Sequence, residues 1–216
     1  MRLSTRLIVL KITRTGEKSL VVHAISPELG RRSYIVTAGR GMAMWQPLSV
    51  LDAEIVENPK SSLWRLHSVS QVHRLSGLRS SVVKNAAALF ISEVLWRTIR
   101  EGALEDGLWE WVEESILKLD AIEADACPNF HLRWLLELCG ALGFSPTRED
   151  LMPFAGERLE EIGELLTLDY AQSLMLPLNG STRSEIAEIL LQYLGYHCET
   201  AINVRSLSVL HELFSS

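Results

Sequence analysis

The chain has 216 residues, of which 47% are hydrophobic and 22% are charged, with a formal net charge of −6. This composition is typical of a globular protein and excludes a disordered one, and the length allows one large domain or two small ones. The first apolar run, Leu7–Leu10, is only four residues long, so we expect neither a signal peptide nor a membrane span.

The first eighty residues predict β-structure. β-Branched and alternating apolar runs are separated there by turns rich in Gly, Pro and Asn, a pattern typical of short strands. The predicted strands are Leu7–Ile12, Leu20–Ser26, Ser33–Ala38, Leu48–Glu57 and Leu63–Val72. Five short strands within roughly seventy residues fit a small barrel. We therefore predict an OB-fold over residues 1–80.

After Ser80 the apolar period changes from two to about 3.6 residues, which predicts helices. The predicted helices are 81–100, 104–119, 128–142, 157–166, 182–194 and 206–214. Pro153 and Gly156 predict an irregular segment over 151–156. Ser181 or Thr182 is expected to cap the helix 182–194, with Glu185 as the capping-box acid. The fold class is thus α+β, an N-terminal five-stranded OB-fold barrel followed by an all-α domain over 81–216.

The charge is divided unevenly along the chain. Up to Lys84 there are 13 Lys and Arg against 5 Asp and Glu, a balance of +8. Since the whole chain has 21 basic and 27 acidic residues, the remainder holds 8 and 22, a balance of −14. A basic barrel predicts binding to a polyanion, whereas the acidic helical domain predicts other partners. The alternative is an uneven but functionless solvated surface.

Basic residues near the predicted turns are the DNA-binding candidates. OB-folds bind oligonucleotides across one face and its loops, with cations for phosphates and aromatic rings for bases. The candidates are Arg14, Lys18, Arg31, Arg32 and Arg40. Tyr34, Trp45 and Trp64 are candidates for base stacking. For each of these aromatic residues the alternative is packing in the barrel core.

The sequence contains no motif of catalysis. A P-loop, a dinucleotide-binding GxGxxG after a strand, GxSxG and HExxH are all absent. Residues 38–41 (AGRG) resemble a phosphate loop, but no helix is predicted after them, so we interpret them as an inter-strand loop. Cys127, Cys139 and Cys198 form no CxxC pair, which argues against a zinc site or disulfides. We predict no enzymatic activity, no cofactor and no metal, in a reducing cytoplasm.

Several segments, in the same order and with similar spacing, resemble the RecO family of bacterial recombination mediators, in the form common in Bacteroidetes. They include a turn and strand, a QPL strand, the first long helix, a helix ending in an LGF-x-P sequence, and the C-terminal helix. These segments are Glu28–Arg31 with Ser33–Val36, Gln46–Glu54, Lys84–Ala86 with Ala88–Leu95, Asn129–Leu132 through Leu142–Pro146, and Ser206–Phe214. Residues 148–176 match poorly.

The resemblance implies an OB-fold that binds single- and double-stranded DNA, and a helical domain that binds partners. It also implies strand annealing and help in loading recombinase onto strands coated with single-strand-binding protein. The implied partners are RecR and the C-terminal tail of single-strand-binding protein, with no membrane. Many relatives have a four-cysteine zinc module that this chain lacks. The competing hypothesis is a protein–protein adaptor whose barrel no longer binds DNA.

The resemblance also directs attention to the third predicted helix as the tail-binding site. The tail ends in an apolar residue with a free carboxylate, so its receptor needs an apolar notch beside a cation. Arg133 is the one basic residue between Lys118 and Arg148. The predicted partner-binding residues are Phe130, Arg133, Trp134 and Leu138. In the alternative, Arg133 only pairs with Glu137 one helical turn away.

Overall fold

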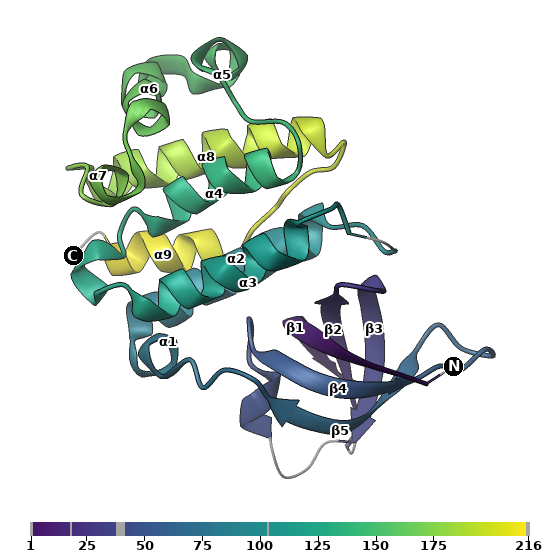
Figure 1. Cartoon of the computed structure of the whole chain (residues 1–216). Coiled ribbons are helices and arrows are strands. Elements are labelled where there is room, and N and C mark those ends of the chain that lie inside the picture. Colours follow the sequence, from purple (N-terminus) through teal and green to yellow (C-terminus); the bar gives the residue numbers. More distant parts are fainter. Residues whose placement is uncertain (1, 18, 38–41, 103, 215–216) are drawn as a thin grey trace. The chain divides into compact units, whose positions relative to one another are not determined.

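The N-terminal part of the computed structural model is a closed barrel. The model describes residues 2–17, 19–37, 42–102 and 104–214. The strands are β1 Arg2–Arg14, β2 Ser19–Ser26, β3 Gly30–Thr37, β4 Val50–Val56 and β5 Trp64–Gln71. They close in the order β1-β2-β3-β5-β4, with β3 and β5 parallel and the other pairs antiparallel (Figure 1). This topology confirms the predicted five-stranded OB-fold.

The interior of the barrel is filled by every second residue of each strand. In β2, for example, Leu20, Val22 and Ala24 are buried in one apolar cluster with residues of the other four strands. Because successive side chains of a strand point to opposite sides, the residues between these three face outward. The turn from β2 to β3 ends at Gly30, whose φ of 59° suits glycine.

The strand β1 is longer than predicted. Its first half pairs with β4, from Arg2 opposite Val56, and its second half pairs with β2, ending with Arg14 opposite Leu20. A bulge near Val9 and Lys11 separates the two halves. The sequence before Leu7 is mostly polar, with Leu3 as the one apolar residue between Arg2 and Arg6, so the prediction missed this half of the strand.

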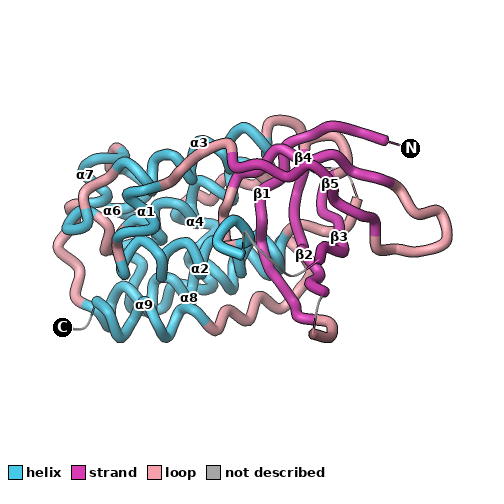
Figure 2. The backbone as a smooth tube through the Cα atoms, turned by 90° about the horizontal axis from the view of Figure 1, so that it is seen from below, coloured by secondary structure: helices cyan, strands magenta, loops and turns pink. Residues whose placement is uncertain are grey.

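The rest of the chain is helical, as predicted. The α-helices are α1 Ser76–Ser80, α2 Val82–Thr98, α3 Leu108–Ala121, α4 Phe130–Ala141, α5 Arg148–Ala155, α6 Leu159–Thr167, α7 Tyr170–Leu174, α8 Gly180–His197 and α9 Ser206–Phe214. Figure 2 shows the strands, in magenta, as one connected group. The α+β fold class is therefore confirmed.

Two compact units divide the chain, one of residues 1–76 and 99–116, the other of residues 77–98 and 117–216. Within the first unit, the segment after α2 contacts the barrel. The Arg31 amide donates to the Gly102 carbonyl at 3.1 Å, and Arg6 pairs with Glu113 of α3 at 2.6 Å. The predicted domain boundary, between residues 1–80 and 81–216, placed this segment in the helical domain instead of with the barrel. The division into these two domains stays a prediction.

The segment predicted to be irregular at 151–156 is largely helical. It continues α5, which begins with a capping box. The hydroxyl of Thr147 accepts from the Asp150 amide at 3.2 Å, and a carboxylate oxygen of Asp150 accepts from the Thr147 amide at 2.9 Å. Pro153 lies inside this helix. The short helix thus tolerates a proline that the prediction treated as a breaker.

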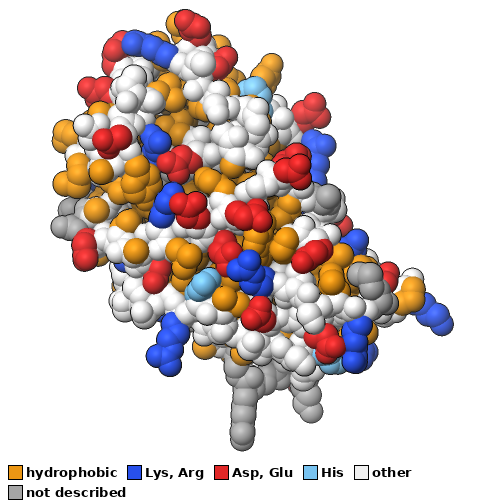
Figure 3. Space-filling view, viewed as in Figure 1, with side chains coloured by type: hydrophobic (Ala, Val, Ile, Leu, Met, Phe, Trp, Pro, Cys, Tyr) orange, Lys and Arg blue, Asp and Glu red, His pale blue; other side chains and the backbone are white. Residues whose placement is uncertain are grey.

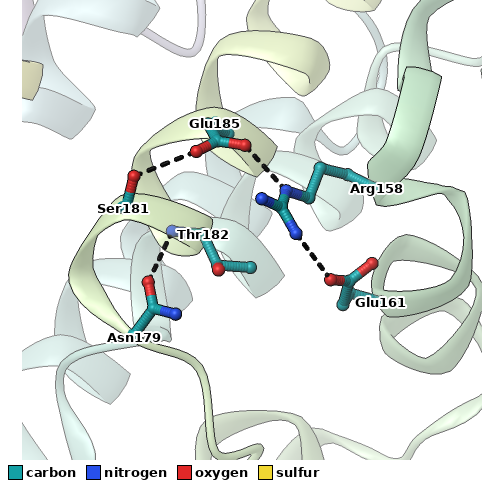
Figure 4. Close-up of polar contacts among 6 residues, drawn as sticks. All are labelled: Arg158, Glu161, Asn179, Ser181, Thr182 and Glu185. Atoms are coloured by element: carbon teal, nitrogen blue, oxygen red, sulfur yellow. Dashed lines mark hydrogen bonds and ion pairs between the residues drawn. The ribbon is translucent and has the colours of Figure 1, made fainter.

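The N-cap predicted for α8 is also wrong. Asn179 caps the helix, because its side-chain oxygen accepts from the Thr182 amide at 2.9 Å (Figure 4). Ser181 instead donates to Glu185 at 2.9 Å, and Glu185 also accepts from Arg158 at 2.7 Å. Asn is as good an N-cap as Ser, so the sequence offered equivalent candidates.

We expect Asn179→Ala to lower the free energy of unfolding by about 1 kcal/mol, because the first turn of α8 loses its cap. Ser181→Ala is the matched control, since it removes only an exposed contact and is expected to have a much smaller effect. Urea unfolding of both variants measures the difference. Equal losses would contradict the assignment of Asn179 as the cap.

Candidate nucleic-acid interface

A row of polar side chains crosses the outer surface of three neighbouring strands. His23 of β2 lies at its centre. Its Nε2 is 3.3 Å from the Thr13 hydroxyl of β1, and its Nδ1 is 2.8 Å from the Ser33 hydroxyl of β3. Both ring nitrogens are thus within hydrogen-bond distance of neighbouring strands. The row gives this side of the barrel a polar surface, as an interface with a nucleic acid requires.

Cations surround this row. Lys11 lies directly opposite His23 in the β1–β2 register, and Arg65 of β5 lies opposite Ile35 of β3. Arg31 of β3 is half-buried and faces outward beside them. We call the outward-facing set of Lys11, Thr13, His23, Arg31, Ser33 and Arg65 the basic face.

His23 is expected to be neutral at pH 7. Burial lowers its pKa below the ordinary 6.5, and the charges of Lys11 and Arg31 lower it further, against a smaller opposing effect of Glu101. The positive charge of the basic face therefore comes from lysine and arginine. Near neutral pH, titration of His23 therefore does not change the attraction of the basic face for an anion.

The carboxylates of the strands lie on a different side of the barrel, on β4, whereas the charge of Glu101, after α2, acts on His23 and Arg31. Neither β2 nor β3 contains Asp or Glu. Asp52 and Glu54 of β4, together with Glu28, instead line a hollow of about 680 Å³. Arg6 lines this hollow too, and Arg2 of β1 is 3.3 Å from Glu54. We therefore expect a polyanion to favour the basic face over the β4 side.

The three predicted DNA-binding residues that the structure describes do not form one cluster. Arg14 is exposed at the end of β1. Arg31 and Arg32 alternate to opposite sides of β3, and the guanidinium of Arg32 lies 4.3 Å from the centre of the Trp64 ring. Lys18 and Arg40 lie outside the described residues. Contact between DNA and these five residues stays a prediction.

The three aromatic residues considered for base stacking are packed in the barrel. Tyr34, Trp45 and Trp64 are buried members of its apolar core. Desolvation raises the pKa of the Tyr34 hydroxyl to about 12. The core-packing alternative is thus confirmed for all three.

Five of the six members of the basic face, all except Arg31, were not among the predicted DNA-binding residues. Lys11, His23 and Arg65 lie in predicted strands, away from the turns on which the prediction concentrated. Strand alternation from the apolar residues would have placed His23 and Arg65 outward, but it would have placed Lys11 inward, in phase with Leu7 and Val9. The bulge in β1 and the pairing of β3 with β5 bring them together, and neither can be predicted from local sequence.

The predicted partner-binding residues occupy α4, mostly on its buried side. Phe130 and Trp134 are 2% exposed, and Leu138 is completely buried. Arg133 donates to Glu137 at 2.8 Å and to the Leu168 carbonyl at 3.1 Å. The alternative pairing of Arg133 with Glu137 is therefore present. Tail binding by these residues stays a prediction, and the apolar members line the core instead of an open notch.

The described part of the chain contains no group of three or more His, Cys, Asp or Glu residues arranged to hold a metal ion. Cys127 and Cys139 are buried, and desolvation raises their pKa to about 11 and about 12. Both thiols are thus protonated at neutral pH.

Among the described helices, none combines the length and the hydropathy of a bilayer-spanning segment.

Comparison with known proteins identifies the family. Residues 1–75 match the family model described as Recombination protein O N terminal, and residues 79–150 match that described as Recombination protein O C terminal. The chain belongs to the RecO family. The first match covers the barrel, and the second covers the segment from α1 into α5.

Curated relatives match over the whole length. DNA repair protein RecO of Flavobacterium psychrophilum is 30% identical over 240 residues, covering 100% of both chains. The protein of the same name from Bacteroides fragilis is 28% identical, covering 96% of this chain and 97% of the relative. That of Flavobacterium johnsoniae is 28% identical, covering 100% of both chains. Membership of this family supports a role in DNA repair.

We expect simultaneous Lys11→Ala and Arg65→Ala to weaken binding of single-stranded DNA and to reduce the slope of log K against log salt by about 1.4. The reason is that each cation that neutralises a phosphate contributes about 0.7 to the slope on single strands. Arg2→Ala, an exposed cation on the β4 side, is the matched control and should leave the slope unchanged. Equal changes of the slope in both proteins would contradict the assignment of the basic face as the DNA-binding surface.

Proposed function

We propose that this chain is a non-enzymatic recombination mediator in DNA repair. In this role it binds and anneals single-stranded DNA and helps to load recombinase onto strands coated with single-strand-binding protein. RecR is its proposed second partner, on the basis of family membership alone. Double-stranded DNA is a further proposed ligand of the same barrel.

The observation that carries the proposal is the separation of charge on the barrel. Lysine and arginine side chains flank the polar row of β1, β2 and β3, whereas Asp52 and Glu54 project from β4. Phosphate neutralisation needs cations, and the basic face supplies Lys11, Arg31 and Arg65. Lys11 and Arg65 are the proposed phosphate contacts.

An adaptor that no longer binds DNA is the second candidate function. The burial of Tyr34, Trp45 and Trp64 favours it, because these rings are not available for stacking on bases. Sequence-tolerant binding of single strands commonly draws on such stacking. The two candidates differ in whether the barrel has affinity for DNA.

Annealing of two complementary oligonucleotides tests the mediator. We expect the parent chain to accelerate annealing at low salt, and the Lys11→Ala, Arg65→Ala double variant to lose most of this acceleration. Arg2→Ala is again the control, and thermal melting establishes that all three proteins are folded. Absence of DNA binding by the folded parent at low salt would reject the mediator and favour the adaptor.

The tail of single-strand-binding protein is proposed to dock near Arg133, on the exposed side of α4. Tyr170 of α7 is beside this residue, since the charges of Glu137 and Arg133 both act on its hydroxyl. The ammonium of Lys118 lies 5.6 Å from the centre of the Tyr170 ring. In Figure 3, apolar side chains gather at the end of the helical unit where Figure 1 places α7. An apolar surface beside two cations suits a tail that ends in an apolar residue with a carboxylate.

We expect Arg133→Ala to weaken binding of a labelled tail peptide by about 1.5–3 kcal/mol, the range for a hydrogen bond to a charged group. Arg148→Ala is the matched control, because Arg148 is an exposed arginine of α5 that pairs with Glu160. Fluorescence anisotropy measures both affinities. If Arg133→Ala binds within about twofold of the parent, the docking site lies elsewhere.

A further inference from the structure

A groove of about 500 Å³ lies between α8 and the segment that connects α8 to α9. Leu191, Val204 and Leu207 provide apolar lining, and Leu191 is almost completely buried. A second hollow of about 460 Å³ shares Glu188, Val204 and Leu207 with the first. The two therefore form one continuous groove, and its described lining contains neither Lys nor Arg.

One wall of the groove is a strand-like segment, residues 201–204. Ala201 and Asn203 are exposed, whereas Ile202 and Val204 are half-buried, which is the alternation of a β-strand. Yet these residues belong to no sheet, and their backbone groups make no hydrogen bond to any described residue. Four such residues span about 13 Å when extended. The segment has the properties of an open strand edge.

Both ends of this segment are held in place. At its start, the Thr200 amide donates to the Gly195 carbonyl of α8 at 3.0 Å. The approach is close enough that a Cβ on Gly195 would lie 2.7 Å from the Thr200 carbonyl oxygen. At its end, the Ser206 amide donates to Glu93 of α2 at 3.0 Å. The open backbone groups are thus pre-positioned for a partner, which lowers the entropic cost of binding.

The charge of the groove selects the chemistry of the partner. Glu188 is exposed and makes no ion pair with any described residue, while the nearby Glu185 pairs with Arg158 at 2.7 Å. Glu188 therefore repels nucleic acids and acidic peptides. It favours a basic side chain next to the apolar floor.

We propose that this groove binds an extended segment of a partner protein, in which apolar and basic side chains alternate. The segment adds to residues 201–204 as a second strand, through main-chain hydrogen bonds. Its apolar side chains contact the floor at Val204 and Leu207, and its basic side chains approach Glu188. Main-chain pairing supplies affinity in this mode of recognition, and the groove supplies specificity. The proposal is independent of DNA binding by the barrel.

The test uses the full-length chain and a labelled octapeptide of alternating Val and Lys. Two further peptides serve as probes of the mode of binding, one with Glu in place of Lys and one with alternate backbone amides N-methylated. We expect each change to weaken binding at least about tenfold, since one reverses the charge and the other removes main-chain donors. Chemical shift changes at residues 201–204 should accompany binding of the parent peptide.

Glu188→Lys should weaken binding of the Val-Lys peptide at least about tenfold. The matched control is Glu164→Lys, the same charge change at an exposed position of α6 outside the groove, which should leave the affinity unchanged. Thermal melting establishes that both variants are folded. The proposal is overturned if the peptide does not bind at about 1 mM, if both variants weaken it equally, or if N-methylation has no effect. It is also overturned if the groove instead joins two copies of this chain, as sedimentation would reveal.

Discussion

Closure of the five strands into a barrel is the constraint on which the charge separation depends. In a closed barrel each residue of a strand points either into the core or outward, and no strand has a free edge. Alternate residues of β2 and β3 are therefore used for the apolar core, namely Leu20, Val22, Ala24, Tyr34 and Val36. The residues between them have to form the outer surface, and on these two strands none is a carboxylate. The basic face follows from this parity together with the strand order.

The same closure explains how much of the fold could be predicted. Local alternation and turn residues were sufficient for the number of strands and for the α+β class, because both are short-range signals. The first half of β1 was missed because its sequence lacks an apolar run, although pairing with β4 makes it a strand. Asn179 was missed because several good N-caps stand side by side. These errors occur where tertiary pairing or equivalent local choices decide the structure.

The candidate sites show a different limit. A count of charges along the chain placed the positive charge in the N-terminal part, but this part also contains Asp52 and Glu54. Only strand register separates these carboxylates from Lys11 and Arg65, and register is not visible in the local sequence. The pairing of Arg133 with Glu137 was anticipated, because the two residues are one helical turn apart. The neighbour Tyr170 was not anticipated, because it is 37 residues away along the chain.

The barrel and the groove of the helical unit deal with backbone hydrogen bonding in opposite ways. The barrel satisfies its strand ladders internally, so a ligand can recognise it mainly through side chains. Residues 201–204 have strand-like alternation without a neighbouring strand, and the flanking residues Thr200 and Ser206 hold the two ends of this segment through hydrogen bonds to Gly195 and Glu93. Exposed peptide groups of this kind are satisfied by water in the free protein. A partner that replaces this water gains main-chain pairing at a surface where Glu188 repels DNA, so nucleic acid and protein ligands need not compete for one site.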